Sequence, residues 1–265
     1  MQFWYRYRIV TFTVALWIGG AIGTAINARF FGTTLPIYMD VAWNWGALAA
    51  RLTIFGGACI ALLGALVRLW GSSYLGGASV WSTTPHTQAF VTAGPFAWVR
   101  NPLYLGNFLI ILGFFANATP LGLLGSIIGL AVAQHYAVIT EERMLLIAHE
   151  HDFRSYEQSV ARWIPRIPQH ASSPITPSLR LGFLAEIYTF GIVLALFLWA
   201  LGPPSHGRLP LLALLLGIVA QIAINVRRRA MEPTIRPLLG PEFISDGNHT
   251  PGYCQTEQCE EANRS

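Results

Sequence analysis

Two short segments hold most of the residues whose types and spacing could do chemistry. The first runs from Thr92 to Gly106 and reads TAGPFAWVRNPLYLG. Its Gly94-Pro95 step allows a turn with close backbone approach, and Pro102 suits the first turn of a helix. The free N–H groups at that helix start, together with Arg100, could bind a carboxylate such as that of an amino-acid cofactor. The same residues also fit an interfacial anchor, so the segment alone leaves both interpretations open.

The second segment is Thr140-Glu141-Glu142-Arg143, at the end of a long apolar run. Two adjacent carboxylates at a membrane exit are costly unless they are solvated or used. Beyond them an apolar stripe recurs at the spacing of one helical face: Phe153, Tyr156, Val160 and Trp163. We therefore expect a cytoplasmic amphipathic helix that ends near Pro165.

The composition indicates a membrane protein. Hydrophobic residues make up 53% of the 265 residues and charged residues only 11%, against about 25% charged in soluble domains. The arginines flank apolar runs and lack the clustered layout of a nucleic-acid surface, so no nucleic-acid partner is expected. The three cysteines fit no zinc pattern. His149-Glu150-His151-Asp152 lacks the i, i+4 spacing of paired helical ligands, so no metal site is predicted.

Apolar runs that are long enough to cross a bilayer define the fold class. We predict an all-α polytopic membrane protein with about six transmembrane helices. The runs are residues 9–26, 47–66, 104–117, 120–139, 181–201 and 209–226. Asn117-Ala118-Thr119-Pro120 separates the third run from the fourth with turn and helix-start chemistry. Arg51 and Glu186, the charged residues nearest to a span interior, lie close to span ends, so no buried ion relay is expected.

These runs suggest a division of the chain and an orientation. Residues 1–75 hold the first two helices, 76–168 the chemical core, 179–228 a C-terminal helical hairpin and 231–265 a polar tail. Six spans place both termini on one side together with most arginines, whereas the other side holds only Arg29 and Arg208. The positive-inside rule therefore predicts that both termini and both chemical segments face the cytoplasm.

The order of the motifs resembles the isoprenylcysteine carboxyl methyltransferase family, to which the phospholipid methyltransferases are related. The resemblance covers roughly residues 80–168 and is carried by Gly94-Pro-Phe-x-x-x-Arg100-Asn-Pro-x-Tyr104-x-Gly106, a helical hairpin, Glu141-Glu142, Phe153-x-x-Tyr156 and Pro165-Arg166. It implies that S-adenosylmethionine binds between the loop, the hairpin and the acidic pair, and that the last two spans are an addition. The implied cofactor contacts are Gln88, Ala89, Phe90, Val91, Gly94, Phe96, Asn101, Pro102, Leu103, Tyr104, Glu141 and Glu142, and the implied catalytic residues are Glu141 and Arg100.

The resemblance further implies methyl transfer to a lipophilic acceptor that enters from the bilayer, with a carboxylate such as that of prenylated cysteine as the expected acceptor. A carboxylate needs no base, whereas a phospholipid amine must lose a proton, for which Glu141 or Glu142 would be the base. A small-molecule amine or thiol stays open. Asn101 stands where the family usually has His, and an amide cannot titrate near neutral pH, which argues against an acid–base role there.

Two other classes compete with a methyltransferase. A sterol-type membrane reductase would use NADPH, and its phosphate groups would need more basic residues than this region offers: Arg100, Arg154, Arg162 and Arg166. A non-catalytic scaffold or transporter would rest on the membrane helices alone. Membrane lipids are expected partners in every case, and the sequence predicts no oligomeric state.

Overall fold

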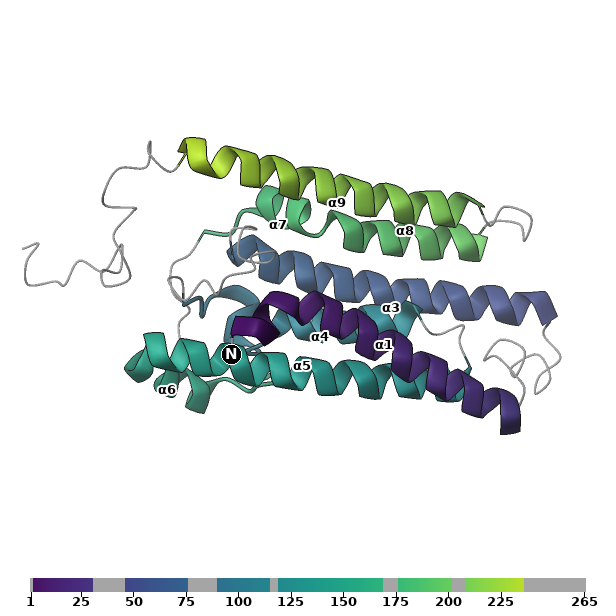
Figure 1. Ribbon diagram of the computed structural model, residues 1–265, viewed down its shortest axis with the longest axis horizontal. Coiled ribbons are helices and arrows are strands. Elements are labelled where there is room, and N and C mark those ends of the chain that lie inside the picture. The colour runs from purple at the N-terminus through teal and green to yellow at the C-terminus, as the bar shows by residue number, and fades with distance from the viewer. Residues whose placement is uncertain are drawn as a thin grey trace, which may run out of the picture. The chain divides into compact units, whose positions relative to one another are not determined.

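The computed structural model describes residues 2–30, 46–75, 90–114, 119–168, 176–201 and 208–235. Within these residues all regular structure is helical, which confirms the predicted all-α class. The elements are α1 (Gln2–Phe30), α3 (Gly46–Tyr74), the 3-10 turn η2 (Gly94–Ala97), α4 (Pro102–Phe114), α5 (Pro120–Ala148), α6 (Glu150–Ser159), α7 (Leu179–Ala185), α8 (Ile187–Leu201) and α9 (Arg208–Ile235) (Figure 1). The chain divides into two units, residues 1–222 and 223–265, and all packing described below lies within the first.

The longest helices support a polytopic membrane protein. Among the described residues, three segments are long and apolar enough to cross a bilayer: Arg51–Tyr74, Pro120–Ala148 and Leu209–Arg227. α7 and α8 together make a fourth candidate, bent by 67°. α4 has 13 residues and is therefore about 20 Å long, shorter than the roughly 30 Å hydrocarbon core. The number of six spans stays a prediction.

α5 begins where the sequence predicts. The Thr119 hydroxyl accepts a hydrogen bond of 3.0 Å from the backbone N–H of Gly122, and Pro120 occupies the first turn. The helix runs on to Ala148, beyond the predicted end at residue 139. No proline or glycine interrupts residues 130–148, so good helix formers carry the apolar span directly into the acidic pair. Glu141 and Glu142 consequently lie within a rigid helix.

The predicted boundaries near two charged residues were wrong. The second span was expected to end at Leu66, but α3 continues to Tyr74 and buries Arg68 inside the bundle. The fifth span was expected to run unbroken over residues 181–201, but it bends at Glu186, which is fully buried. The physical reason is that these two charges neutralise each other, as described below, so neither has to leave the membrane helices.

The expected amphipathic helix is shorter than its apolar stripe. α6 ends at Ser159, and Val160 is extended, with φ −116° and ψ 130°. Phe153 and Tyr156 are buried, which confirms the apolar face. The prediction that Val160 and Trp163 continue this helix was wrong, because the backbone after Ser159 bonds to the loop before α4 instead.

Small residues let the helices approach closely, as is common in membranes. A Cβ on Gly106 of α4 would lie 2.5 Å from Cγ of Arg68 and 2.8 Å from the carbonyl oxygen of Gly64 in α3. α1 packs along α5 in the same way, where Gly19 meets Gly125 (Figure 1). The backbones of α3 and α4, and those of α1 and α5, are therefore in direct contact at these glycines.

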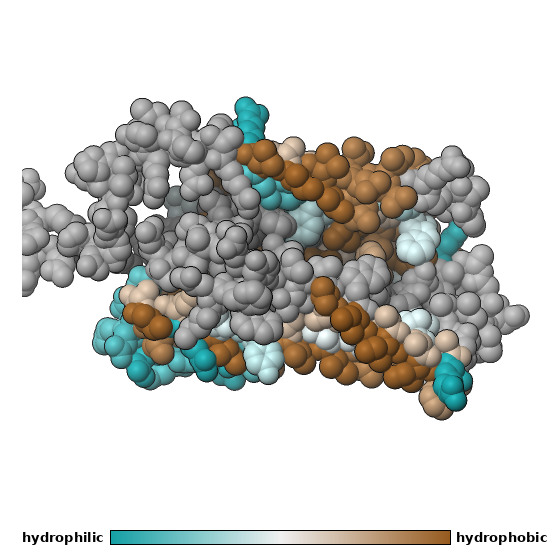
Figure 2. Space-filling view, viewed as in Figure 1, coloured by the Kyte–Doolittle hydropathy of each residue, from teal (hydrophilic) through white to brown (hydrophobic). Residues whose placement is uncertain are grey.

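The outer surface has the polarity that a bilayer requires. α1 exposes one apolar stripe at every fourth residue: Val14, Ile18, Ile22 and Ile26. Figure 2 shows apolar side chains over α1, and hydrophilic ones gathered at the end of the molecule where α6 lies. The residues with polar chemistry thus lie toward one end of the molecule (Figure 2), and their place relative to a membrane stays a prediction.

Candidate functional site

The segment before α4 forms a compact turn against α3 and α6. Gly94 has a φ of 61°, and a Cβ there would overlap the ring of Tyr74, so both conformation and space require glycine. η2 follows at once and buries Pro95 and Phe96. From α6, the hydroxyl of Tyr156 donates a hydrogen bond of 2.7 Å to the carbonyl oxygen of Phe96. The turn is therefore anchored by a helix that follows it by about fifty residues.

Burial raises the pKa of the Tyr156 phenol, against an opposing effect of Arg100 and with a smaller contribution from Glu142. The phenol is therefore a neutral donor at neutral pH. Beside it, the ring of Phe90 lies 5.2 Å from that of Tyr156, edge to face, and 5.7 Å from the imidazole of His149, stacked. The aromatic side chains of α6 and its N-terminal cap thus hold the start of the loop.

Two backbone hydrogen bonds join the loop to the segment after α6. The N–H of Arg100 donates to the carbonyl oxygen of Ala161, and the N–H of Arg166 donates to that of Trp98, both at 2.9 Å. These bonds satisfy backbone groups that a longer α6 would have used internally. They explain why the chain leaves the helix at Ser159.

Glu142 is the centre of a charged cluster, the Glu142 cluster, formed with Arg100, Asn101 and Arg162. Its carboxylate lies 2.7 Å from Nη2 and 3.0 Å from Nε of Arg162. It also lies 3.3 Å from Nη1 of Arg100 and accepts a hydrogen bond of 3.3 Å from the Asn101 amide. The cluster joins α5, the loop and the segment after α6. Because the Glu142 side chain is only 9% exposed, water screens these charges little.

Glu141 has a different neighbour. Its Oε1 accepts a hydrogen bond of 2.7 Å from the hydroxyl of Tyr104, in the first turn of α4. Tyr104 is buried against Ala137 and Val138 of α5. Glu141 itself is half-buried. The two adjacent carboxylates therefore divide their contacts, since Glu142 bonds to the loop and Glu141 to the helix that follows it.

The structure thus brings the two segments found in the sequence into direct contact. Of the predicted cofactor contacts, Asn101, Tyr104, Glu141 and Glu142 form the junction itself, and Pro102 and Leu103 lie beside it in the first turn of α4. Gly94 and Phe96 lie in the turn that Tyr156 anchors, Phe90 packs on Tyr156, and the next residue, Val91, is half-buried. Gln88 and Ala89 lie outside the described residues. The cofactor-binding role of all these residues stays a prediction.

Arg100 carries a donor that fits an anionic ligand. Its Nη1 lies 3.0 Å from Glu157 and 3.3 Å from Glu142. Its Nε, by contrast, is a buried polar atom that has no hydrogen-bond partner among the described residues. An unsatisfied buried donor is unfavourable in itself, and a bound carboxylate would satisfy it.

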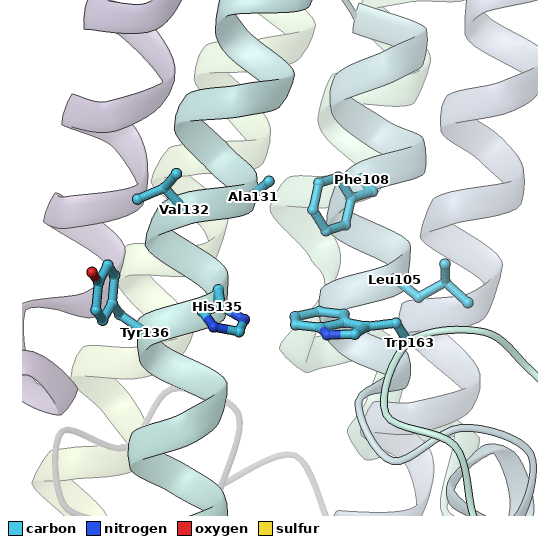
Figure 3. A pocket seen from close by; sticks show the side chains of 7 residues that line it. All are labelled: Leu105, Phe108, Ala131, Val132, His135, Tyr136 and Trp163. Carbon is cyan, nitrogen blue, oxygen red and sulfur yellow. The ribbon is translucent and has the colours of Figure 1, made fainter.

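An apolar cavity of about 670 Å³ opens between α4 and α5. Its walls are Leu105 and Phe108 of α4, Ala131, Val132, His135 and Tyr136 of α5, and Trp163 after α6 (Figure 3). In Figure 3, His135 and Trp163 point toward one another across the cavity. Trp163 also packs against the cluster that contains Tyr104. Trp163 therefore contributes both to the cavity wall and to the packing around Tyr104, the partner of Glu141.

Some contacts of this region were not predicted from the sequence. Tyr156 was expected as part of an apolar stripe and a motif, and Arg162 as one of four basic residues, but the bonds by which they hold the loop were not predicted. The buried ion pair between Arg68 and Glu186 was also not predicted, since Glu186 was expected to lie close to a span end. Only the presence of one opposite charge in each of two apolar runs could have suggested it.

Across the described ranges, no group of three or more His, Cys, Asp or Glu residues could hold a metal ion. His149, Glu150 and Asp152 lie at the junction of α5 and α6, where Glu150 forms an exposed pair of 3.3 Å with Arg154. Glu150, His151 and Asp152 are exposed, whereas His149 is half-buried and stacks on Phe90.

Comparisons with known proteins identify the central part of the chain. Residues 52–149, from α3 to the end of α5, match the family described as phospholipid methyltransferase. The chain is 30% identical over 163 residues to the nickel-cobalt-cadmium resistance protein NccN of Alcaligenes xylosoxydans, covering 60% of this chain and 68% of that protein. It is 32% identical over 162 residues to the cobalt-zinc-cadmium resistance protein CzcN of Cupriavidus metallidurans, covering 60% and 61%. No solved structure matches the chain.

Proposed function

The chain belongs to the phospholipid methyltransferase family of membrane methyltransferases, and on this premise we propose that it transfers the methyl group of S-adenosylmethionine to a lipophilic acceptor. One observation supports this proposal most strongly. The loop at residues 94–104 is bonded to both members of the acidic pair, through Asn101 and Arg100 to Glu142 and through Tyr104 to Glu141. This junction lies at the end of an apolar helix, beside a cavity open to lipophilic ligands.

The residues of the junction suit the charges of S-adenosylmethionine, which carries a zwitterionic amino-acid group and a sulfonium cation. The N–H groups at the start of α4 and the unsatisfied Nε of Arg100 suit its carboxylate. Glu141 suits its positive groups. When bound, the cofactor supplies an electrophilic methyl group. The chain contributes position and charge, which is most of what an in-line displacement needs.

The two carboxylates have different proposed roles. Glu141 and Arg100 are the residues we assign to contact with the cofactor. Glu142 bonds to Arg162, Arg100 and Asn101, so we assign it to holding the loop in place. Gln88, Ala89, Phe90, Val91, Gly94, Phe96, Pro102, Leu103 and Tyr104 complete the proposed cofactor site.

The apolar cavity is the proposed place of the acceptor's hydrocarbon chain. The seven described residues that line it include no Asp, Glu, Lys or Arg, and its volume of about 670 Å³ lies within the ordinary range for ligand pockets. A carboxylate acceptor reacts without loss of a proton, and its charge disperses as it approaches the sulfonium, which a dry pocket favours. We therefore keep a lipophilic carboxylate as the first candidate.

One observation favours a second candidate acceptor, a lipophilic amine or thiol. His135 lies in the wall of the cavity, on a helix that is long and apolar enough to cross a membrane, where polar side chains are costly unless they are used. An imidazole can accept the proton that an amine or thiol must lose, whereas Asn101 cannot. Replacement of His135 by Ala would then abolish transfer to an amine or thiol but leave transfer to a carboxylate unchanged.

A nicotinamide-dependent reductase fits the arginines less well. Arg100 and Arg162 bond to Glu142, and Arg154 bonds to Glu150. A ligand with several phosphate groups would have to displace these carboxylates.

The arginines that follow the apolar helices also support the proposal that both termini and the cofactor site face the cytoplasm.

Ligand-dependent thermal stability tests the proposal directly. The detergent-solubilised protein is titrated with S-adenosylhomocysteine and, separately, with NADPH, because a ligand that binds the folded state raises the melting temperature. We expect a rise with the first ligand and none with the second. No rise with millimolar S-adenosylhomocysteine would refute the proposed cofactor.

Single variants test the site assignment. Glu141→Ala and Arg100→Ala should each abolish the stabilisation by S-adenosylhomocysteine without loss of folding. Glu150→Ala is the matched control, since it removes a carboxylate from an exposed pair on the same membrane face. Retained stabilisation in both site variants would show that the cofactor binds elsewhere. Transfer of a labelled methyl group to prenylated cysteine, compared with transfer to phosphatidylethanolamine in nanodiscs, then distinguishes the two candidate acceptors.

A further inference from the structure

A buried ion pair links the C-terminal hairpin to the rest of the membrane bundle. Glu186 is fully buried at the bend between α7 and α8. Its carboxylate accepts hydrogen bonds from Nε and Nη2 of Arg68, at 2.7 and 2.9 Å. The hydroxyls of Ser72 and Thr189 donate to the same carboxylate, at 2.6 and 2.9 Å. Both carboxylate oxygens are therefore fully bonded.

The other edge of the same guanidinium reaches α4. Nη1 of Arg68 donates to Oδ1 of Asn107 at 2.6 Å and to the carbonyl oxygen of Leu103 at 3.3 Å. These two residues lie one helical turn apart at the start of α4. Gly106, between them, lacks the Cβ that would lie 2.5 Å from Cγ of Arg68, so the arginine stem lies flat against this helix. Arg68 thus connects Glu186 to the first turns of α4.

Those first turns are the part of α4 that carries the proposed cofactor contacts. Asn101 and Pro102 precede Leu103, and Tyr104 follows it with its bond to Glu141. Since a planar guanidinium has fixed donor directions, a bidentate pair on one edge sets the direction of the donors on the other. The position of Glu186 is therefore transmitted to the backbone at Leu103.

A purely stabilising role would not require charges at this place. Removing two charges from water is costly, and apolar side chains of similar size often stabilise a buried site as well as or better than an ion pair does. What apolar side chains cannot do is hold a carbonyl oxygen and a side-chain amide in a set direction. The chemistry of this network therefore suits positioning.

We propose that Arg68 and Glu186 are positioning residues for the cofactor site, and that the C-terminal hairpin is a working part of that site. This inference rests on the proposed function, because the first turns of α4 are assigned to the cofactor there. The hairpin lies outside residues 52–149, which match the family. The hairpin contributes Glu186, whose carboxylate orients Arg68. The guanidinium of Arg68 in turn donates hydrogen bonds to Leu103 and Asn107.

The test uses the full-length protein and the double variant Arg68→Met/Glu186→Leu, which replaces both charges by apolar side chains. Each single variant leaves one buried charge without its partner, so both are expected to lower the melting temperature sharply. The double variant should regain a melting temperature near that of the wild type. Its affinity for S-adenosylhomocysteine should still be lower by about tenfold or more. Wild-type affinity in a stably folded double variant would overturn the inference.

Hydrogen exchange of the α4 backbone provides a readout that does not depend on the cofactor. The amide of Leu105, which bonds to the carbonyl oxygen of Asn101, should exchange at least about tenfold faster in the double variant. Unchanged exchange would overturn the positioning role. If this exchange accelerates while the wild type fails to bind S-adenosylhomocysteine, the positioning role stands and the proposed function fails.

Two further variants separate this network from hairpin packing in general. Asn107→Leu removes a bond between Arg68 and α4 but leaves the ion pair intact, and it should reproduce part of the loss of affinity. Gln221→Leu is the matched control, because the Gln221 amide of α9 donates to the carbonyl oxygen of Leu184 and accepts from the backbone N–H of Tyr188, both bonds lying within the C-terminal hairpin. Gln221→Leu should leave the affinity at the wild-type value. An equal loss in both variants would indicate general loosening of the hairpin and overturn the inference.

Discussion

Glu142→Gln is expected to loosen the loop before α4 without unfolding the membrane helices. The two shortest contacts of the carboxylate are those with Arg162, at 2.7 and 3.0 Å, and the Arg162 side chain is 33% exposed. Hydrogen bonds to charged groups contribute about 1.5–3 kcal/mol each, and neutral ones about half as much. Loss of the charge from two such bonds, reduced for the exposure of Arg162, amounts to about 2 kcal/mol.

A loss of about 2 kcal/mol corresponds to roughly thirtyfold more frequent opening of the loop. Native-state hydrogen exchange measures this opening at the amides of Arg100 and Arg166, which bond across the two segments. Glu150→Gln is the control, because its exposed pair with Arg154 contributes only about 0.3–0.5 kcal/mol. If the Arg100 amide exchanges at the same rate in both variants, Glu142 does not hold the loop and the reasoning is refuted.

Two further predictions concern the same junction. Tyr104→Phe removes the hydroxyl bonded to Glu141 and should reduce methyl transfer by about tenfold, or about 1.4 kcal/mol, with an unchanged melting temperature; unaltered turnover would count against a role for Glu141. Because burial raises the pKa of Tyr156, its neutral form is favoured in the folded protein. Its contribution to stability should persist below the ordinary tyrosine pKa of about 10 and be lost as pH rises beyond it. Tyr156→Phe should remove this dependence in alkaline melting curves.

The sequence predicted those parts of the fold that depend on local chemistry. Pro102 and Pro120 mark helix starts, and both helices begin there. The contact between the loop and the acidic pair also followed, because a short hairpin of apolar helices returns the chain to the same membrane face. The role of each carboxylate could not be predicted, since it depends on the rotation of α5 about its axis, which places Tyr104 beside Glu141.

The errors arose where distant residues change the cost of a local structure. A charge normally ends an apolar span, so the second span was predicted to end before Arg68, and Glu186 was placed near the start of the fifth. Each is tolerated inside because the other lies 2.7 Å away, a relation that no local pattern contains. The prediction that the helix continues along the apolar stripe after Phe153 was wrong for a similar reason, because backbone hydrogen bonds to the loop compete with one more turn of α6.

The same ion pair has a consequence for how the chain is made. Arg68 and Glu186 are 118 residues apart, so synthesis at roughly 5–20 residues per second separates them by about 6–24 seconds. During that interval the arginine enters the membrane without its partner, at a cost of up to about 3 kcal/mol near the middle of a helix. Its long side chain can reach the interface from the end of α3. The pair that neutralises Arg68 can therefore form only after Glu186 has been synthesised.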